Sequence, residues 1–389
     1  MTQPLHERIE AFMAPRRAES LELLARLVVI QSGSRNKAGL DRMADEMALV
    51  LGQILPETRI LPFEGSGNMV QAMTRPAARG EKGIVLVGHM DTVFPADTVF
   101  TDYREDETRC FGPGVYDMKG GLVVAVYALK ALDHLGLLAD MPITVLCNSD
   151  EEIGSPVSRP WIEEQSRDAL AALVFEGGGT NRDVVTGRKG RLGLRLTVRG
   201  RAGHAAKGGP KASAILELAH KIIALEDLNG VAGATLNVGQ VSGGIGPNTV
   251  PDLASAELDI RFPDQRAQAL IEEAAAELTA RMTIPGTTAE LSPTSGRPAM
   301  PQSDGNRRLY AIIRDQARLF GYDLPEELRS GVSDANFIGG LGVPVLDGLG
   351  PVGDLDHSEL EFILKNSIFE RIALTAATIA EIWNHERRL

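Results

Sequence analysis

The stretch Val85-Leu86-Val87-Gly88-His89-Met90-Asp91-Thr92-Val93 carries the strongest structural signal in this sequence. A short apolar run leads directly into His89 and Asp91, a pattern that predicts a buried strand with two polar side chains at its carboxyl end. In open α/β sheets, ligands bind at that end of the strands. The stretch therefore predicts a functional site at one edge of a sheet.

In three other segments, apolar residues are likewise followed by acids or a histidine. They are 145–152, which ends in Asp150-Glu151-Glu152, 173–176, which ends in Glu176, and the loop around His357. Predicted strands alternate with predicted helices around these segments, which indicates an α/β fold whose mostly parallel sheet has helices on both faces. We expect the polar ends of these segments to converge on one metal site.

The length of 389 residues favours two domains. Beyond residue 187 the pattern changes, because Arg191–Arg199 alternates apolar and polar residues as a half-exposed antiparallel strand does. The elements that follow are predicted in the order β-α-β-β-α-β, which is the ferredoxin-like arrangement. We therefore predict a catalytic domain formed by 1–186 and 298–389, with an α+β domain inserted at 187–297.

Composition narrows the class of protein. Hydrophobic residues make up 43% and charged residues 24%, as in ordinary globular proteins, and a formal net charge of −12 argues against nucleic acid as a partner. Cys110 and Cys147 cannot form a disulfide framework, which favours a reducing compartment. No apolar stretch approaches the roughly 18 residues that a membrane span needs, and no secretory signal is visible, so we expect a cytoplasmic protein without a membrane partner.

A hydrolytic site with two metal ions needs mostly anionic oxygen ligands, a few imidazoles and one carboxylate between the ions. The candidate residues match that inventory. We interpret His89 and Glu176 as ligands of one ion, Glu152 and His357 as ligands of the other, and Asp117 as the bridge. Zn²⁺ is the expected metal, two ions per subunit, although the same ligands also permit Co²⁺ or Mn²⁺.

Two further acids are expected to support the chemistry. Asp91 lies two residues after His89, on the same side of an extended chain, where its carboxylate would accept the second imidazole N–H. Consecutive side chains in extended backbone point to opposite sides, so Glu152 would bind metal while Glu151 faces the substrate. Glu151 would then be the general base that takes a proton from the attacking water and passes it to the leaving nitrogen.

Each of these residues also has an ordinary structural interpretation. His89 and Asp91 could be a packing pair, Asp117 a turn residue, Glu151 and Glu152 the start of a solvated helix. Taken together and in this order, the residues favour the metal site.

With these residues assembled, the chain resembles the co-catalytic zinc metallopeptidase family of bacterial glutamate carboxypeptidase, succinyl-diaminopimelate desuccinylase, aminoacylase and tripeptidase. The resemblance covers nearly the whole chain and is strongest to the glutamate carboxypeptidase branch. Five pieces carry it in order: Gly88–Val93, Gly114–Gly121, Asp150–Ser155, Phe175–Gly177 and His357-Ser358. It implies the same ligand roles and a cis peptide bond between Asp117 and Met118.

The resemblance also implies that the inserted domain is a lid and dimerisation module, so that a homodimer is expected. In Arg201-Ala202-Gly203-His204-Ala205-Ala206, His204 matches the family histidine that stabilises the tetrahedral oxyanion, often across the dimer.

Four other residues match substrate-binding positions of the family. Asn248 lies in the matching lid loop, and Arg261 matches an arginine that contacts a substrate carboxylate. Arg297 resembles the arginine that holds the free C-terminal carboxylate, which a guanidinium can bind with two hydrogen bonds. Gly331 resembles a glycine-rich turn of the branch, although Val332 and Ser333 follow it where more glycine is typical.

These inferences lead to one main function and two alternatives. The main one is a dinuclear zinc hydrolase that cleaves an amide bond next to a free carboxylate and releases a C-terminal amino acid, with glutamate as the best candidate. Its substrate would be a small molecule or short peptide. The alternatives are an N-acyl-amino-acid deacylase and, from another class, a catalytically idle metal-binding dimerisation protein. The presence of Glu151 argues against the idle protein.

Overall fold

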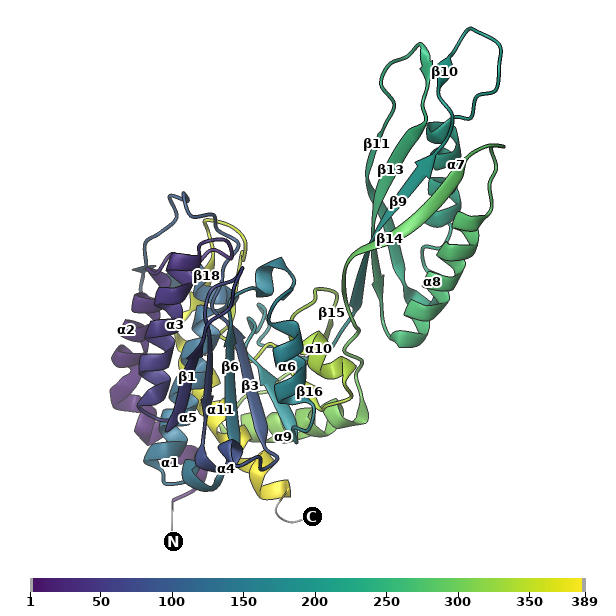
Figure 1. Ribbon diagram of the computed structural model, residues 1–389. Helices are drawn as coiled ribbons and strands as arrows, with labels where there is room; N and C mark the ends of the chain where they lie inside the picture. The colour runs from purple at the N-terminus through teal and green to yellow at the C-terminus, as the bar shows by residue number, and fades with distance from the viewer. Residues whose placement is uncertain (1–2, 387–389) are drawn as a thin grey trace. The chain divides into compact units, whose positions relative to one another are not determined.

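The chain forms two compact units in the computed structural model, which describes residues 3–386 (Figure 1). The first unit is built from the chain before Arg188, from Gln302–Arg329 and from the chain after Val332. The second consists of Arg188–Pro301 together with Ser330–Val332. The predicted insertion covers 187–297, and the return of Ser330–Val332 to the second unit is a feature that the prediction lacks.

The first unit contains a six-stranded sheet with the strand order β1-β2-β6-β3-β7-β16. The four strands β6, β3, β7 and β16 run parallel, while β2 is antiparallel to β6 and β1 is antiparallel to β2. The bounds are β1 Glu57–Leu61, β2 Met69–Met73, β3 Ile84–His89, β6 Ile143–Asn148, β7 Ala171–Val174 and β16 Val345–Leu346.

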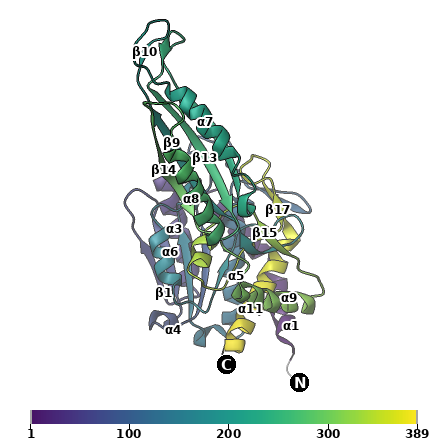
Figure 2. The same cartoon turned by 90° about the vertical axis from the view of Figure 1, so that its right-hand side faces the viewer.

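Strand β3 lies inside this sheet, and all six of its residues are buried. Helix α6 (Arg159–Ser166) lies on one face of the sheet, whereas α5 (Gly120–His134) and α11 (Lys365–Glu386) lie on the other (Figures 1 and 2). Burial on both faces explains why β3 is a continuous apolar run rather than an alternating one. The predicted α/β fold, with a mostly parallel sheet between helices, is confirmed.

The remaining helices of the first unit surround this sheet. The chain before Val29 forms two helices rather than one, because Pro15 lies in a 3₁₀ turn at Ala14–Arg16 and lacks the backbone N–H that a helix interior requires. Their bounds are α1 Leu5–Met13, α2 Arg17–Val28, α3 Lys37–Gly52, α4 Arg75–Ala78, α9 Asp304–Leu319 and α10 Ala335–Gly340.

A small four-stranded sheet in the first unit has the order β17-β18-β5-β4. Its bounds are β4 Arg104–Glu105, β5 Arg109–Phe111, β17 Gly353–Asp354 and β18 Phe362–Leu364, and a separate pair joins β8 Val184–Arg188 to β15 Glu326–Arg329. Because β18 pairs with both β17 and β5, the loop between β17 and β18 is held close to the chain that follows β5. The first of these segments contains His357 and the second leads to Asp117.

The second unit has the predicted order β-α-β-β-α-β. Its antiparallel sheet is ordered β11-β13-β9-β14, and α7 and α8 pack together against that sheet (Figure 1). The bounds are β9 Gly190–Arg199, α7 Ala214–Glu226, β11 Thr235–Gly243, β13 Leu253–Phe262, α8 Gln265–Ala280 and β14 Thr288–Arg297. Alternate residues of β13 are buried, as expected when one face of a sheet covers a core. The ferredoxin-like prediction is confirmed.

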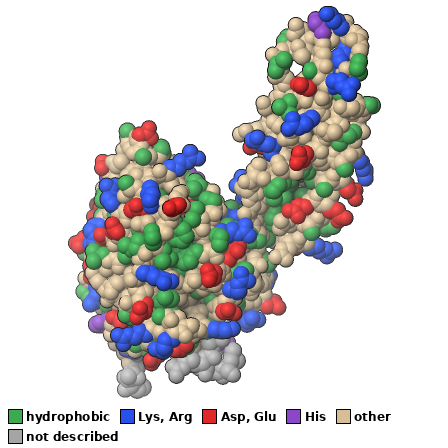
Figure 3. Space-filling view, in the orientation of Figure 1, with side chains coloured by type: hydrophobic (Ala, Val, Ile, Leu, Met, Phe, Trp, Pro, Cys, Tyr) green, Lys and Arg blue, Asp and Glu red, His purple; other side chains and the backbone are tan. Residues whose placement is uncertain are grey.

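Charges of both signs are interspersed over the face of the first unit that Figure 3 shows. Within residues 3–386, no helix is long and apolar enough to cross a membrane.

Candidate metal centre

The carboxylate of Asp117 lies between two imidazoles. Its Oδ1 atom is 3.0 Å from Nε2 of His89, and its Oδ2 atom is 3.3 Å from Nε2 of His357. Asp117 lies in the turn before α5, His89 at the end of β3, and His357 in the loop after β17. One carboxylate thus presents a separate oxygen to each imidazole, which is the arrangement expected of a bridging ligand.

Each imidazole has a second carboxylate beside it. Glu176 Oε1 is 3.7 Å from His89 Nε2, and Glu152 Oε2 is 3.4 Å from His357 Nε2. The structure therefore brings all five predicted metal ligands together, divided into the two groups that the sequence predicts. Their role as ligands remains a prediction.

Two more acids have oxygen atoms close to this cluster. A carboxylate oxygen of Glu151 lies within 4.8 Å of donor atoms of both His89 and Glu176, which places the predicted general base beside the predicted ligands. A carboxylate oxygen of Asp356 likewise lies within 4.8 Å of ligand atoms of Asp117 and His357. Asp356 is one of the acidic neighbours of His357 in the sequence, but nothing in the sequence singles it out for a place in the cluster.

Burial and mutual charge shift the protonation of these groups. Burial alone would lower the pKa of His89, but its hydrogen bonds to Asp117 and Asp91 raise that pKa well above its usual value. Hydrogen bonds to Asp117 and Glu152 raise the pKa of His357 to about 11. Burial and the nearby charge of Asp117 raise the pKa of Glu152 to about 8, and the same two causes raise the pKa of Glu176.

The donor set fits a divalent transition metal. Three mostly buried carboxylates, those of Asp117, Glu152 and Glu176, lie beside only two imidazoles, and buried carboxylates require cationic partners. Carboxylate oxygens with imidazole nitrogens are ligands that Zn²⁺ accepts. The residues present therefore match what the sequence predicts for the site.

The turn that carries Asp117 has an irregular backbone. Gly114 begins it at φ 75°, and a Cβ atom at that position would come within 2.7 Å of Thr92 Cγ2, so glycine is required there. The Asp117–Met118 peptide bond is cis, as the resemblance implies.

Glu151 and Glu152 lie in a 3₁₀ turn at Glu151–Ile153, so the prediction of extended backbone at this pair is wrong. The physical reason lies in Asp91, which is completely buried and whose two oxygens accept the backbone N–H groups of Glu151 and Glu152, each at 3.1 Å. The predicted contact of Asp91 with His89 is present in altered form. Nδ1 of His89 is 3.0 Å from the Asp91 backbone oxygen and 3.4 Å from its carboxylate.

Several polar residues around the cluster were not predicted. Ser34 Oγ donates to Asp91 Oδ2 at 2.7 Å, and Asn148 Nδ2 donates to Asp334 Oδ2 at 2.7 Å behind the Glu151 turn. Glu361 accepts hydrogen bonds from the Asp117 turn and is 1% exposed. A usable signal exists for Glu361, because it is an acid between apolar neighbours in Leu360-Glu361-Phe362-Ile363-Leu364. The partners of Ser34 and Asn148 are too distant in sequence to be recognised.

Two of the predicted lid residues lie side by side in the second unit. His204 belongs to the short strand β10 (Gly203–His204), which pairs with β12 (Thr249–Val250). The backbone N–H of Ala205 donates to the backbone oxygen of Asn248 at 2.9 Å. Both His204 and Asn248 are exposed, so their side chains are accessible.

The predicted substrate arginines share one row of the sheet in the second unit. Arg191 on β9 is the cross-strand partner of both Arg261 on β13 and Arg297 on β14. Arg261 Nε donates to Asp259 Oδ1 at 2.8 Å, and Arg297 is 5% exposed.

Gly331 is exposed, and its backbone oxygen accepts a hydrogen bond from Arg188 Nη1 at 3.0 Å. The structure thus brings Gly331 to the second unit through its backbone.

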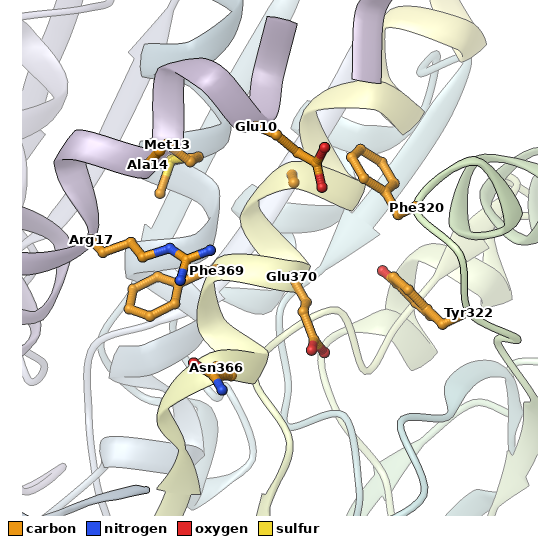
Figure 4. A pocket seen from close by; sticks show the side chains of 10 residues that line it. Glu10, Met13, Ala14, Arg17, Phe320, Tyr322, Asn366, Phe369 and Glu370 are labelled. Carbon is orange, nitrogen blue, oxygen red and sulfur yellow. The ribbon is translucent and has the colours of Figure 1, made fainter. Parts of the chain in front are cut away.

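A cavity of about 480 Å³ lies elsewhere in the first unit, between α1, α11 and the end of α9 (Figure 4). Phe320, Tyr322 and Phe369 contribute aromatic rings to it, and Glu10 and Arg17 contribute charges. It shares no residue with the acid and imidazole cluster, so its size does not make it the candidate site.

The fold and the cluster together define a metal-dependent hydrolase built on an α/β domain with a ferredoxin-like insertion. More particularly, the chain belongs to peptidase family M20/M25/M40, which matches residues 85–381. This family is metal-dependent, and the chain is an enzyme of the metallopeptidase and amidohydrolase kind. The suspected family is confirmed, and the idle binding protein is not supported.

Known proteins resemble this chain over most of its length. Carboxypeptidase G2 of Pseudomonas sp. (strain RS-16) is 26% identical over 375 residues, covering 93% of this chain and 89% of that protein. Acetylornithine deacetylase of Pasteurella multocida (strain Pm70) is 28% identical over 240 residues, covering 57% of this chain and 61% of that protein. The crystal structure of aminopeptidase PepT from Bacillus cereus has a TM-score of 0.75 at 19% identity, covering 94% and 99% of the two chains, and shows the shared fold.

Proposed function

We propose that this enzyme is a dinuclear zinc hydrolase that cleaves an amide bond next to a free carboxylate and releases a C-terminal amino acid. The observation that carries the proposal is the position of Asp117, whose two oxygens face His89 and His357 separately. Glu176 and Glu152 complete the two halves. A carboxylate shared in this way is what a pair of adjacent ions requires.

The residues of the chain have distinct roles in the proposed reaction. When bound, the metal ions would polarise the scissile carbonyl and lower the pKa of the attacking water. Glu151 takes a proton from that water and returns it to the leaving nitrogen, and its carboxylate beside Glu176 and His89 suits this role. The carboxylate of Asp91 positions Glu151 by accepting the backbone N–H of Glu151. We assign to His204 the stabilisation of the tetrahedral oxyanion, on the resemblance alone.

The proposed product is an amino acid with a free α-carboxylate, and glutamate is the first candidate. Similarity to a carboxypeptidase along 93% of this chain supports C-terminal cleavage. Arg297 and Arg261 are the proposed carboxylate partners, with Asn248 and Gly331 contributing to the substrate-binding loops. A guanidinium is suited to a carboxylate because its planar donors match both oxygens.

The second candidate function is removal of an acyl group from an N-acyl amino acid. Similarity to an acetylornithine deacetylase over 57% of this chain favours it specifically. Both functions use the same cluster and differ in the side of the amide bond that the enzyme recognises.

We further propose a homodimer formed through the second unit. Apolar side chains are exposed on neighbouring elements there, with Ile223 of α7 65% exposed and Val241 of β11 62% exposed. The resemblance implies that this unit is a dimerisation module, and exposed apolar side chains are suited to a protein–protein contact.

Hydrolysis of a substrate panel tests the proposed function. The purified enzyme is stripped of metal, reloaded with Zn²⁺, Co²⁺ or Mn²⁺, and assayed on peptides and N-acyl amino acids ending in glutamate, aspartate or neutral residues. Two Zn²⁺ per chain and preferred release of glutamate from peptides or acyl donors would support the main proposal. Preference for N-acetyl substrates regardless of the C-terminal residue would support the deacylase, and a metal-independent activity would contradict both.

A further inference from the structure

One buried carboxylate joins the two loops that carry Asp117 and His357. Glu361 is 1% exposed and lies at the end of the loop that begins after β17 and contains His357. Its Oε2 atom accepts the backbone N–H of Gly114 at 2.8 Å. Its Oε1 atom accepts the N–H groups of Tyr116 at 2.8 Å and Asp117 at 2.9 Å.

Burial raises the pKa of Glu361 to about 7, while its backbone N–H donors act in the opposite direction, because hydrogen bonds to an ionised acceptor are stronger than those between neutral groups. Three of them converge on this one carboxylate, and they engage a turn that otherwise has irregular backbone, with Gly114 at φ 75°. A side chain that satisfies three buried N–H groups at once restricts where that turn can lie, because each unmade bond would leave a buried donor unsatisfied.

The same short segment therefore holds Asp117 at two points. His357 Nε2 lies 3.3 Å from the Asp117 carboxylate, while Glu361 receives the Asp117 backbone N–H. Strand β18 follows Glu361 directly and pairs through Phe362 with Phe111 of β5. This pairing sets the register of the segment relative to the chain that leads to the Asp117 turn. The loop between β17 and β18 thus contacts Asp117 both through its side chain and through its backbone.

A further hydrogen bond extends the arrangement to the other side of the cluster. The hydroxyl of Tyr116 accepts the backbone N–H of Gly179 at 3.1 Å, three residues after Glu176. Displacing the Asp117 turn would therefore disturb the Glu176 loop as well as the His357 loop.

We infer that Glu361 is a positioning residue that clamps the Asp117 turn to the His357 loop and so sets the geometry of the proposed two-metal site. Glu361 is not placed among the ligands, since its carboxylate is occupied by three backbone N–H groups. The inference rests on the proposed function, because it concerns how tightly this chain holds the proposed ions.

The test is the substitution Glu361→Gln in the full-length enzyme. Glutamine has nearly the same shape, so the fold should survive, and its single oxygen can keep the bonds to Tyr116 and Asp117. Its amide NH₂ would then face the N–H of Gly114, donor against donor. Glu359→Gln is the matched control, because Glu359 lies in the same loop and is exposed.

Two readouts separate positioning from a general contribution to stability. The first is the Zn²⁺ dissociation constant, measured by chelator competition well below the melting temperature of each variant. The second is amide hydrogen exchange of Gly114, Tyr116 and Asp117 in the metal-free protein, a measurement that depends neither on metal binding nor on activity. We expect Glu361→Gln to weaken Zn²⁺ binding on the order of 10–100-fold, to speed exchange at Gly114, and to lower kcat with little change in KM.

The inference would be overturned if Glu361→Gln bound Zn²⁺ and exchanged its amide hydrogens as the wild type does and differed only in a lower melting temperature. The proposed function would then remain intact. Equal weakening in Glu359→Gln would also overturn it, because charge in the loop would then be the cause. A wild-type enzyme that binds no metal would overturn the proposed function and, with it, this inference.

Discussion

The carboxylate of Asp91 accepts the backbone N–H of Glu152, with 3.1 Å between the oxygen and the nitrogen. The other oxygen of Asp91 accepts the N–H of Glu151. Asp91 lies two residues beyond the end of β3, and the 3₁₀ turn follows β6, the strand that pairs with β3. One buried acid thus connects the strand that supplies His89 to the turn that supplies the proposed base and one proposed ligand.

Replacement of Asp91 tests this connection. Asp91→Asn has one acceptor oxygen in place of two, so one of the two N–H groups must lose its partner. We expect kcat/KM to fall about 10–100-fold, a range typical of residues that orient metal ligands. Steady-state kinetics at saturating Zn²⁺ would show it, with Asp97→Asn in an exposed loop as the control. Unchanged kinetics in Asp91→Asn would show that the turn does not need this anchor.

Glu151 and Glu152 should behave differently although they are neighbours. In Glu151→Gln the proton acceptor is lost, and we expect kcat to fall by about 10²–10⁴-fold while two Zn²⁺ remain bound. In Glu152→Gln a ligand is lost, and we expect metal content to fall first. Metal analysis beside single-turnover kinetics distinguishes the two. Loss of metal in Glu151→Gln to the same extent would make Glu151 a ligand instead of a base.

Metal affinity should depend on pH. Because burial and the charge of Asp117 raise the pKa of Glu152 to about 8, this carboxyl group is mostly protonated at pH 7 in the metal-free protein. Ions must displace that proton, so protons are released on binding and affinity increases with pH. We expect the Zn²⁺ dissociation constant to increase as the pH is lowered from about 8 to about 6. Chelator competition at several pH values measures it, and a constant affinity would contradict the expectation.

Asp334 should contribute to stability more than to chemistry. Its oxygens accept hydrogen bonds from Asn148 Nδ2 and from the hydroxyl of Ser155, and the side chain is 2% exposed. In Asp334→Ala these buried donors lose an acceptor, and we expect the free energy of unfolding to fall by about 1–3 kcal/mol. Urea denaturation monitored by circular dichroism measures it. Asp323→Ala, in an exposed position, should leave the midpoint where it is.

The proposed homodimer can be tested on the surface of α7. Ile223→Asp places a charge on an apolar side chain that is 65% exposed, and a charge buried without a partner is costly at an interface. We expect the mass in solution, measured by light scattering, to shift from dimer to monomer. Leu319→Asp, at a 54% exposed leucine of α9 in the first unit, should not change it. A wild-type enzyme that is already monomeric would refute the proposal.

Many strands and the proposed metal ligands can be predicted from the sequence, because the patterns that indicate them are local. The apolar run before His89 predicts a buried strand, and the alternation along Arg191–Arg199 predicts a half-exposed one. The five proposed ligands lie at the end of a strand, shortly after one, or in a loop or turn, so residue chemistry suffices to group them: His89, Asp117, Glu152, Glu176 and His357. Their division between the two imidazoles agrees with the distances between the atoms.

The tertiary structure decided what holds those residues in place. The backbone at Glu151 is a 3₁₀ turn because a carboxylate from another strand accepts its N–H groups, and no local pattern encodes that contact. Glu361 meets Gly114 for the same reason, since strand pairing between β18 and β5 brings together two segments far apart in the chain. Local sequence determines which side chains are available at each strand end, whereas hydrogen bonds between distant segments determine where those side chains lie.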